Sequence, residues 1–136
     1  MRKNYTYIKN YFIFAFETTN FEAMTVNIYE QYFAASLIAN EVPRRAALVM
    51  LISDSEAGYI QYVAQVTFFP HRFEDDFAVS YDACFGKVIY EAKGRRSKKR
   101  EQALLEGFRS HIDQLAEEAG GEVFWDQPLR EARREV

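Results

Sequence analysis

Residues 46–68 read AALVMLISDSEAGYIQYVAQVTF and predict two neighbouring β-strands joined by a turn. An apolar run fills residues 46–52, and the turn-forming stretch 54–58 follows it. From Ile60 to Phe68, apolar side chains alternate with Gln61, Gln65 and Thr67, which is the period of a strand with one buried face. A β-sheet is therefore the expected centre of the fold.

The composition is that of one globular domain. The chain has 136 residues, of which 49% are hydrophobic and 16% aromatic, so it can form a substantial core. The single cysteine, Cys84, excludes an internal disulfide framework and any zinc site with several cysteines, and it favours a reducing compartment. No stretch reaches the roughly 18 apolar residues of a membrane span. We therefore expect a cytoplasmic protein without a membrane contact.

Apolar residues recur every three or four positions from Thr25 to about Glu41, and Pro43 follows. This spacing predicts an amphipathic helix with Thr25 as its N-cap and Pro43 beyond its end. The residues on the predicted apolar face are Ile28, Tyr29, Tyr32, Phe33, Ser36, Leu37 and Ile38.

The second half of the chain predicts a hairpin, a helix and a final strand. Residues 77–83 and 88–91 have strand-like patterns, and Gly86-Lys87 between them predicts a tight turn. Ser97 is the predicted N-cap of a helix whose apolar stripe ends before Gly120-Gly121, and residues 122–125 predict a strand. The expected fold is α/β (α+β), with two main helices on a single mixed sheet of about four to five strands. The expected order is α-β-β-β-β-α-β within one domain, residues 24–127.

The two ends of the chain differ from this domain. Residues 1–23 are rich in Tyr, Phe, Ile, Lys and Asn, so they are either translated sequence upstream of a native start at Met24 or a genuine first strand. Residues 128–136 predict a charged C-terminal helix or tail.

Positive charge is concentrated in residues 93–100. Without these six of its 17 Lys and Arg, the chain has 11 cations against 20 acidic residues. A polyanion would therefore be attracted to this segment and repelled by much of the remaining surface, which favours a localised contact with nucleic acid. A solvated loop and first helical turn is the alternative explanation. The six cations are Lys93, Arg95, Arg96, Lys98, Lys99 and Arg100.

Asp82, Glu91 and Lys93 form the main candidate catalytic site. Glu91 and Lys93 project from the same face of a strand, and the predicted turn at 86–87 would bring Asp82 alongside them. Two neighbouring carboxylates favour Mg²⁺, and an adjacent ammonium can orient water or stabilise phosphate charge. The alternative is that Glu91 and Lys93 are exposed strand residues that pair across the sheet.

The stretch from Tyr81 to Gly94 resembles the Asp and Glu-x-Lys hairpin of the PD-(D/E)xK nuclease superfamily, especially small phage-type junction resolvases. The resemblance implies that Asp82 and Glu91 ligate Mg²⁺, that Lys93 assists the attacking water, and that Glu30 of the first helix joins the metal site. It also implies a small DNA endonuclease, which could act as a homodimer.

Two other interpretations remain open. Pro70-His71 and Ser97-Lys98-Lys99 resemble features of double-stranded-RNA-binding domains. The acidic remainder of the chain instead favours a non-enzymatic accessory or inhibitor protein of a mobile element, with a protein partner.

The other candidate residues favour structural roles. Cys84 is expected to be a buried small hydrophobe, and His111 is expected at the edge of the core. His71 with residues 74–76 could bind a metal, although a solvated loop is the simpler explanation.

Overall fold

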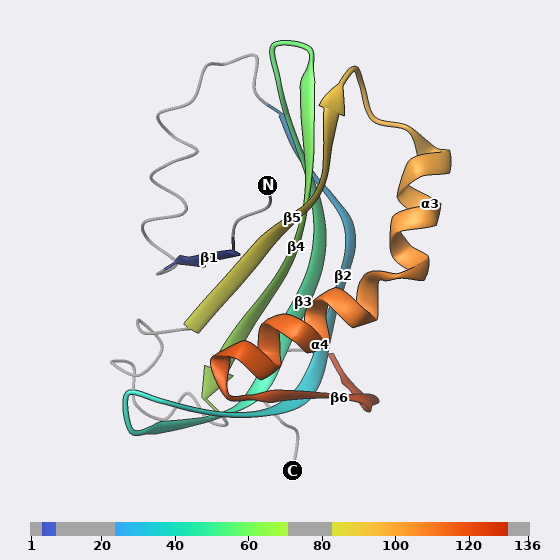
Figure 1. Ribbon diagram of the computed structural model, residues 1–136. Helices are drawn as coiled ribbons and strands as arrows, with labels where there is room; N and C mark the ends of the chain where they lie inside the picture. Colours follow the sequence, from blue (N-terminus) through green and yellow to red (C-terminus); the bar gives the residue numbers. More distant parts are fainter. Residues whose placement is uncertain (1–3, 8–23, 71–82, 131–136) are drawn as a thin grey trace.

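The computed structural model describes residues 4–7, 24–70 and 83–130, which form an antiparallel sheet with two helices over one face (Figure 1). The expected α+β class is confirmed, although strands predominate and every described pairing is antiparallel rather than mixed. The six strands lie in the order β1 (Asn4–Tyr7), β5 (Ala83–Lys93), β4 (Tyr59–Pro70), β3 (Val42–Glu56), β2 (Met24–Ala39) and β6 (Glu122–Leu129).

The two helices connect strands on opposite sides of the sheet. Helix α3 spans Lys98–Glu106 and helix α4 spans Phe108–Ala119, both between β5 and β6 in the chain. Because β5 lies beyond β4 and β6 lies beyond β2, this connection crosses the face of the sheet. The apolar stripe predicted from Ser97 onward is confirmed as helical, but Gly107 ends α3 and begins α4.

Strands β3 and β4 confirm the central prediction. Val49 pairs with Val66 and Leu51 with Ala64, and all four side chains are buried. The turn between the strands contains Ala57 and Gly58, which both have positive φ, as two-residue hairpin turns require. Both strands are longer than the patterns predicted, because β3 continues to Glu56 through the polar residues 53–56 and β4 continues to Pro70.

The predicted helix over residues 25–41 is wrong, because these residues form β2. Strand β2 pairs with β3 but shifts register between Asn27 and Tyr29 and again between Ala34 and Leu37. Each β-bulge changes which alternate residues face the core, so the inward residues do not follow a simple period of two. The resulting spacing imitates a helical stripe, although aromatic and β-branched residues favour the strand. The β2 residues in or against the main core are Ile28, Tyr29, Phe33, Ala35, Leu37 and Ala39.

The predicted tight turn at Gly86-Lys87 is also wrong. Strand β5 continues through both residues, and Gly86 pairs with Gln65 of β4 on one side and Tyr5 of β1 on the other. Glycine inside a strand often marks a position where another backbone approaches closely. Residues 71–82, including most of the strand predicted at 77–83, lie outside the described residues.

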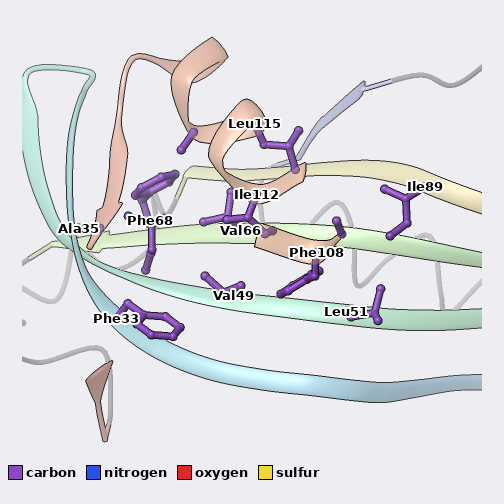
Figure 2. Packing of buried hydrophobic residues seen from close by; sticks show 14 of the residues in the cluster. Phe33, Ala35, Val49, Leu51, Val66, Phe68, Ile89, Phe108, Ile112 and Leu115 are labelled. Atoms are coloured by element: carbon purple, nitrogen blue, oxygen red, sulfur yellow. The ribbon is translucent and has the colours of Figure 1, made fainter. Parts of the chain in front are cut away.

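The main core lies between the sheet and the helices. Phe108, Ile112 and Leu115 of α4 belong to one buried cluster with Val66 and Phe68 of β4 (Figure 2). Burying a side chain of this size contributes about 1.5–3 kcal/mol. This packing holds the helical connection against the sheet and so positions the segment that precedes it.

The last strand extends the sheet on the far side of β2. The strand predicted at 122–125 is confirmed and continues to Leu129, so Pro128 and Leu129 belong to β6 rather than to a C-terminal helix. At the other end of the chain, Asn4–Tyr7 form β1 against β5. Residues 1–3, 8–23 and 131–136 lie outside the described residues, so the native start at Met24 stays a prediction.

Candidate nucleic-acid interface

The basic segment, residues Lys93–Arg100, connects the end of β5 to the first turn of α3 (Figure 1). All eight residues are exposed. Gly94 adopts φ of 120°, a value that side chains disfavour, and its N–H donates to the Gly58 carbonyl at 2.7 Å. The start of the segment is therefore tied to the β3–β4 turn.

Ser97 forms the N-cap of α3, as predicted. Its side chain accepts a hydrogen bond from the Arg100 N–H at 3.2 Å, and its carbonyl accepts from the Glu101 N–H at 2.9 Å. The partial positive charge of a helix N-terminus adds to the charge of Lys98 and Lys99 in the same turn. The cap thus concentrates positive potential at one place.

Glu101 anchors the basic segment to the sheet. Its two carboxylate oxygens accept hydrogen bonds from Arg96 Nε and a terminal Arg96 nitrogen, both at 2.9 Å, and Oε2 also accepts from the Tyr62 hydroxyl at 2.8 Å. The Glu101 side chain is 7% exposed and the Arg96 side chain is 41% exposed, so the carboxylate of the pair is largely shielded from solvent. The Arg96 hydrogen bonds hold the pKa of Glu101 below its usual range.

Tyr62 lies beneath this ion pair on β4. Its ring is buried, and its hydroxyl accepts a long hydrogen bond, 3.4 Å, from the Ser97 N–H. Burial is the main cause that raises the pKa of Tyr62. Ser97 and Glu101 therefore meet at one buried hydroxyl, and Arg96 joins them through Glu101, which fixes the path of the segment over the sheet.

Two of the six cations are occupied by contacts within the chain. Arg96 pairs with Glu101, and the Arg100 guanidinium lies 4.4 Å from the centre of the Tyr90 ring. Lys93, Arg95, Lys98 and Lys99 make no ion pair within the described residues. These four exposed cations can accept phosphate without first losing a carboxylate partner.

Glu91 and Lys93 lie on the same face of β5, as predicted. On the neighbouring strand β4, Glu91 pairs with Gln61 and Lys93 pairs with Tyr59. Gln61 Nε2 donates a hydrogen bond to Glu91 Oε2 at 3.4 Å. Asp82 lies outside the described residues. Ala83, the next residue, begins β5 eight residues before Glu91, about 26 Å along an extended strand. The turn that would have brought Asp82 to Glu91 is absent, so their closeness stays a prediction.

Glu30 is not near Glu91. It is exposed on β2 and accepts a hydrogen bond from Asn27 at 3.0 Å. Strands β3 and β4 lie between β2 and β5, a separation of about 14 Å at usual strand spacing. Within residues 4–7, 24–70 and 83–130, no group of three or more His, Cys, Asp or Glu is placed to hold a metal ion.

The remaining candidates have the following positions. Cys84 is buried as expected, and its sulfur lies 3.2 Å from Thr67 Oγ1. His111 is half-buried on α4, in agreement with its expected place at the edge of the core. His71 and residues 74–76 lie outside the described residues.

The comparisons with known proteins give no relative. Protein-family models, curated proteins and solved structures were all searched, and none matches this chain. Neither α3 nor α4, the helices of the described ranges, has the length and apolar character of a membrane crossing. Both family resemblances imply a first helix, whereas this chain has strand β2 at residues 24–39.

Sequence reasoning identified the basic segment but missed the residues that hold it. Glu101 follows the expected capping-box position by one residue, and this offset was the only signal that its side chain has another partner. Tyr62 lies on the inward face of a regular strand, where its pattern predicts a core residue and gives no indication of a polar role.

Proposed function

We propose that this chain binds the phosphate backbone of nucleic acid through the basic segment. The observation that supports this most strongly is the set of four exposed cations without ion pairs in the described residues: Lys93, Arg95, Lys98 and Lys99. Cations neutralise phosphates and release counterions, which provides most of the sequence-independent affinity for nucleic acid.

The organisation of the segment also supports a binding role. A purely solvated loop has no need of a buried carboxylate that holds one of its arginines, yet Glu101 holds Arg96 with two hydrogen bonds. A fixed segment loses less conformational freedom when it binds. The acidic remainder of the chain disfavours phosphate elsewhere, so one small contact region is expected.

Metal-dependent phosphodiester hydrolysis is the enzymatic form of this proposal. Glu91 and Lys93 share a face at the end of the strand that leads into the basic segment, on the side of the sheet opposite Tyr62. In this form Glu91 would help to hold Mg²⁺, and Lys93 would orient the attacking water. Cleavage of branched, duplex and single-stranded DNA with Mg²⁺ or Mn²⁺ tests it. Loss of cleavage in both Glu91→Ala and Lys93→Ala would support hydrolysis, and no cleavage by the folded parent would restrict the function to binding.

The binding proposal is tested with Lys98→Ala/Lys99→Ala. Fluorescence anisotropy with labelled single-stranded DNA, duplex DNA and duplex RNA at low salt should show weaker binding by this variant. Arg45→Ala/Arg130→Ala is the control, because it removes two exposed cations elsewhere. Arg45 lies on β3 eleven residues before Glu56, about 36 Å along the strand from the turn that holds Gly94.

Equal binding by the two variants would contradict a localised contact. No binding of any probe by the folded parent at low salt would refute the proposal and favour the alternative function, an accessory or inhibitor protein that binds a protein partner.

A further inference from the structure

An exposed aromatic ring lies at the start of the basic segment. Among the aromatic residues of ranges 24–70 and 83–130, Tyr59 alone is exposed, at 40% of its surface. Its position is the first of β4, directly after the turn whose Gly58 carbonyl accepts from Gly94. The other aromatic side chains of these two ranges are half-buried or buried, so the exposure of this ring is unusual among them.

Tyr59 and Lys93 are cross-strand neighbours. They occupy directly paired positions of β4 and β5, which places their side chains on one face of the sheet. Side chains in such pairs have Cβ atoms about 4.5–5.5 Å apart. A phosphate that binds Lys93 and Arg95 would therefore bring the attached nucleotide close to the Tyr59 ring.

Glu91 lies diagonally across from Tyr59 on the same face of the sheet. A hydrogen bond to Glu91 is the main cause that raises the pKa of Tyr59. Gln61 donates to the same carboxylate, so Glu91 is itself oriented. Much of the ring surface remains in contact with solvent.

We propose that Tyr59 stacks on an unpaired nucleobase of a single-stranded nucleic acid whose backbone binds the basic segment. This inference rests on the proposed function and names its substrate class. Proteins that bind single strands combine a positively charged path for the backbone with aromatic side chains that stack on the bases. In a duplex the base faces are already stacked on one another, so Tyr59 would gain no partner there. A ring that only covers strand β5 is the competing explanation, and it predicts no dependence on the base.

The test compares Tyr59→Ala with Tyr59→Phe, which keeps the ring and removes only the hydroxyl. The probes are a labelled oligothymidylate, an abasic oligonucleotide of the same length and a duplex of the same length. Stacking contributes about 1–3 kcal/mol per base, which corresponds to roughly 5- to 150-fold in affinity. We expect Tyr59→Ala to lose that factor on oligothymidylate but to bind the abasic strand and the duplex as the parent does. Tyr59→Phe should retain tight binding of oligothymidylate.

A 2-aminopurine placed within the oligonucleotide gives a direct readout. Its fluorescence should be quenched when the parent or Tyr59→Phe binds, and not when Tyr59→Ala binds. Circular dichroism of each variant verifies the fold.

The outcomes separate this inference from the proposed function. If Lys98→Ala/Lys99→Ala weakens binding while Tyr59→Ala leaves oligothymidylate affinity unchanged, the stacking inference is overturned and phosphate binding stands. An equal loss on the abasic strand would also overturn it, because no base is present there. If the parent binds none of the three probes, both proposals fail.

Discussion

Removal of the Tyr62 hydroxyl tests whether the buried network fixes the basic segment to the sheet. Tyr62→Phe removes the 2.8 Å hydrogen bond to Glu101 and the 3.4 Å hydrogen bond from the Ser97 N–H, while the buried ring remains. A hydrogen bond to a charged group contributes about 1.5–3 kcal/mol, and the 3.4 Å contact with Ser97 is too long to add much. We therefore expect the free energy of unfolding to fall by about 1.5–3 kcal/mol.

Chemical denaturation followed by circular dichroism measures this change. Tyr90→Phe is the matched control, because the Tyr90 hydroxyl makes no hydrogen bond within the described residues and its ring would still lie under Arg100. The control should stay close to the parent in stability. Equal free energies of unfolding for Tyr62→Phe and Tyr90→Phe would refute the idea that the hydroxyl anchors this segment.

Two further predictions concern the same fold. The ion pair lowers the pKa of Glu101 in the folded state, so it stabilises the chain at neutral pH, and this contribution disappears as the pH falls from about 4.5 through the lower folded pKa. The stability difference between the parent and Glu101→Gln should therefore shrink in acid, and a difference that does not change with pH would contradict this assignment. Gly121→Ala would place a Cβ 2.6 Å from the Ser36 carbonyl oxygen, so we expect a loss of about 1–3 kcal/mol and a lower Tm. At Gly107 a Cβ meets nothing within 4 Å, and a Tm for Gly107→Ala as low as that for Gly121→Ala would contradict the packing argument.

The parts of the fold that could be predicted from the sequence are those with regular periodicity. Residues 60–68 alternate except at Val63, and β4, Tyr59–Pro70, contains this whole range. Ser97 and Gly120 are strong local signals for the start and end of a helix, and both have those roles. The local sequence was sufficient to predict the structure at these positions because tertiary packing favours the same conformation.

The predictions were wrong where tertiary packing changes the spacing of the inward residues or gives a glycine a different conformation. In β2 two register shifts move the inward face, and the altered spacing was interpreted as helical. At Gly86 the sequence favoured a turn, but close pairing with strands on both sides uses the glycine in an extended conformation. Neither β-bulges nor strand neighbours can be derived from local spacing alone.

In the candidate site, too, the features that depend on local sequence could be predicted and those that depend on packing could not. The basic segment was visible as a run of charges, because charge density is a property of the sequence. The contacts of Glu101 with Tyr62, which lies 39 residues earlier, depend on how α3 packs over β4. The expected approach of Asp82 to Glu91 failed to gain support because it depended entirely on the turn at residue 86.

The most direct test of the central claim is the salt dependence of nucleic-acid binding. If the four exposed cations each neutralise one phosphate, the plot of log affinity against log salt has a slope of about −2.8 on single strands and about −3.6 on a duplex. For Lys98→Ala/Lys99→Ala the slope on single strands should be about half as steep, near −1.4, while Arg45→Ala/Arg130→Ala should keep the parent value. A parent slope near zero, or the same slope in the parent and in Lys98→Ala/Lys99→Ala, would contradict a phosphate contact at the basic segment.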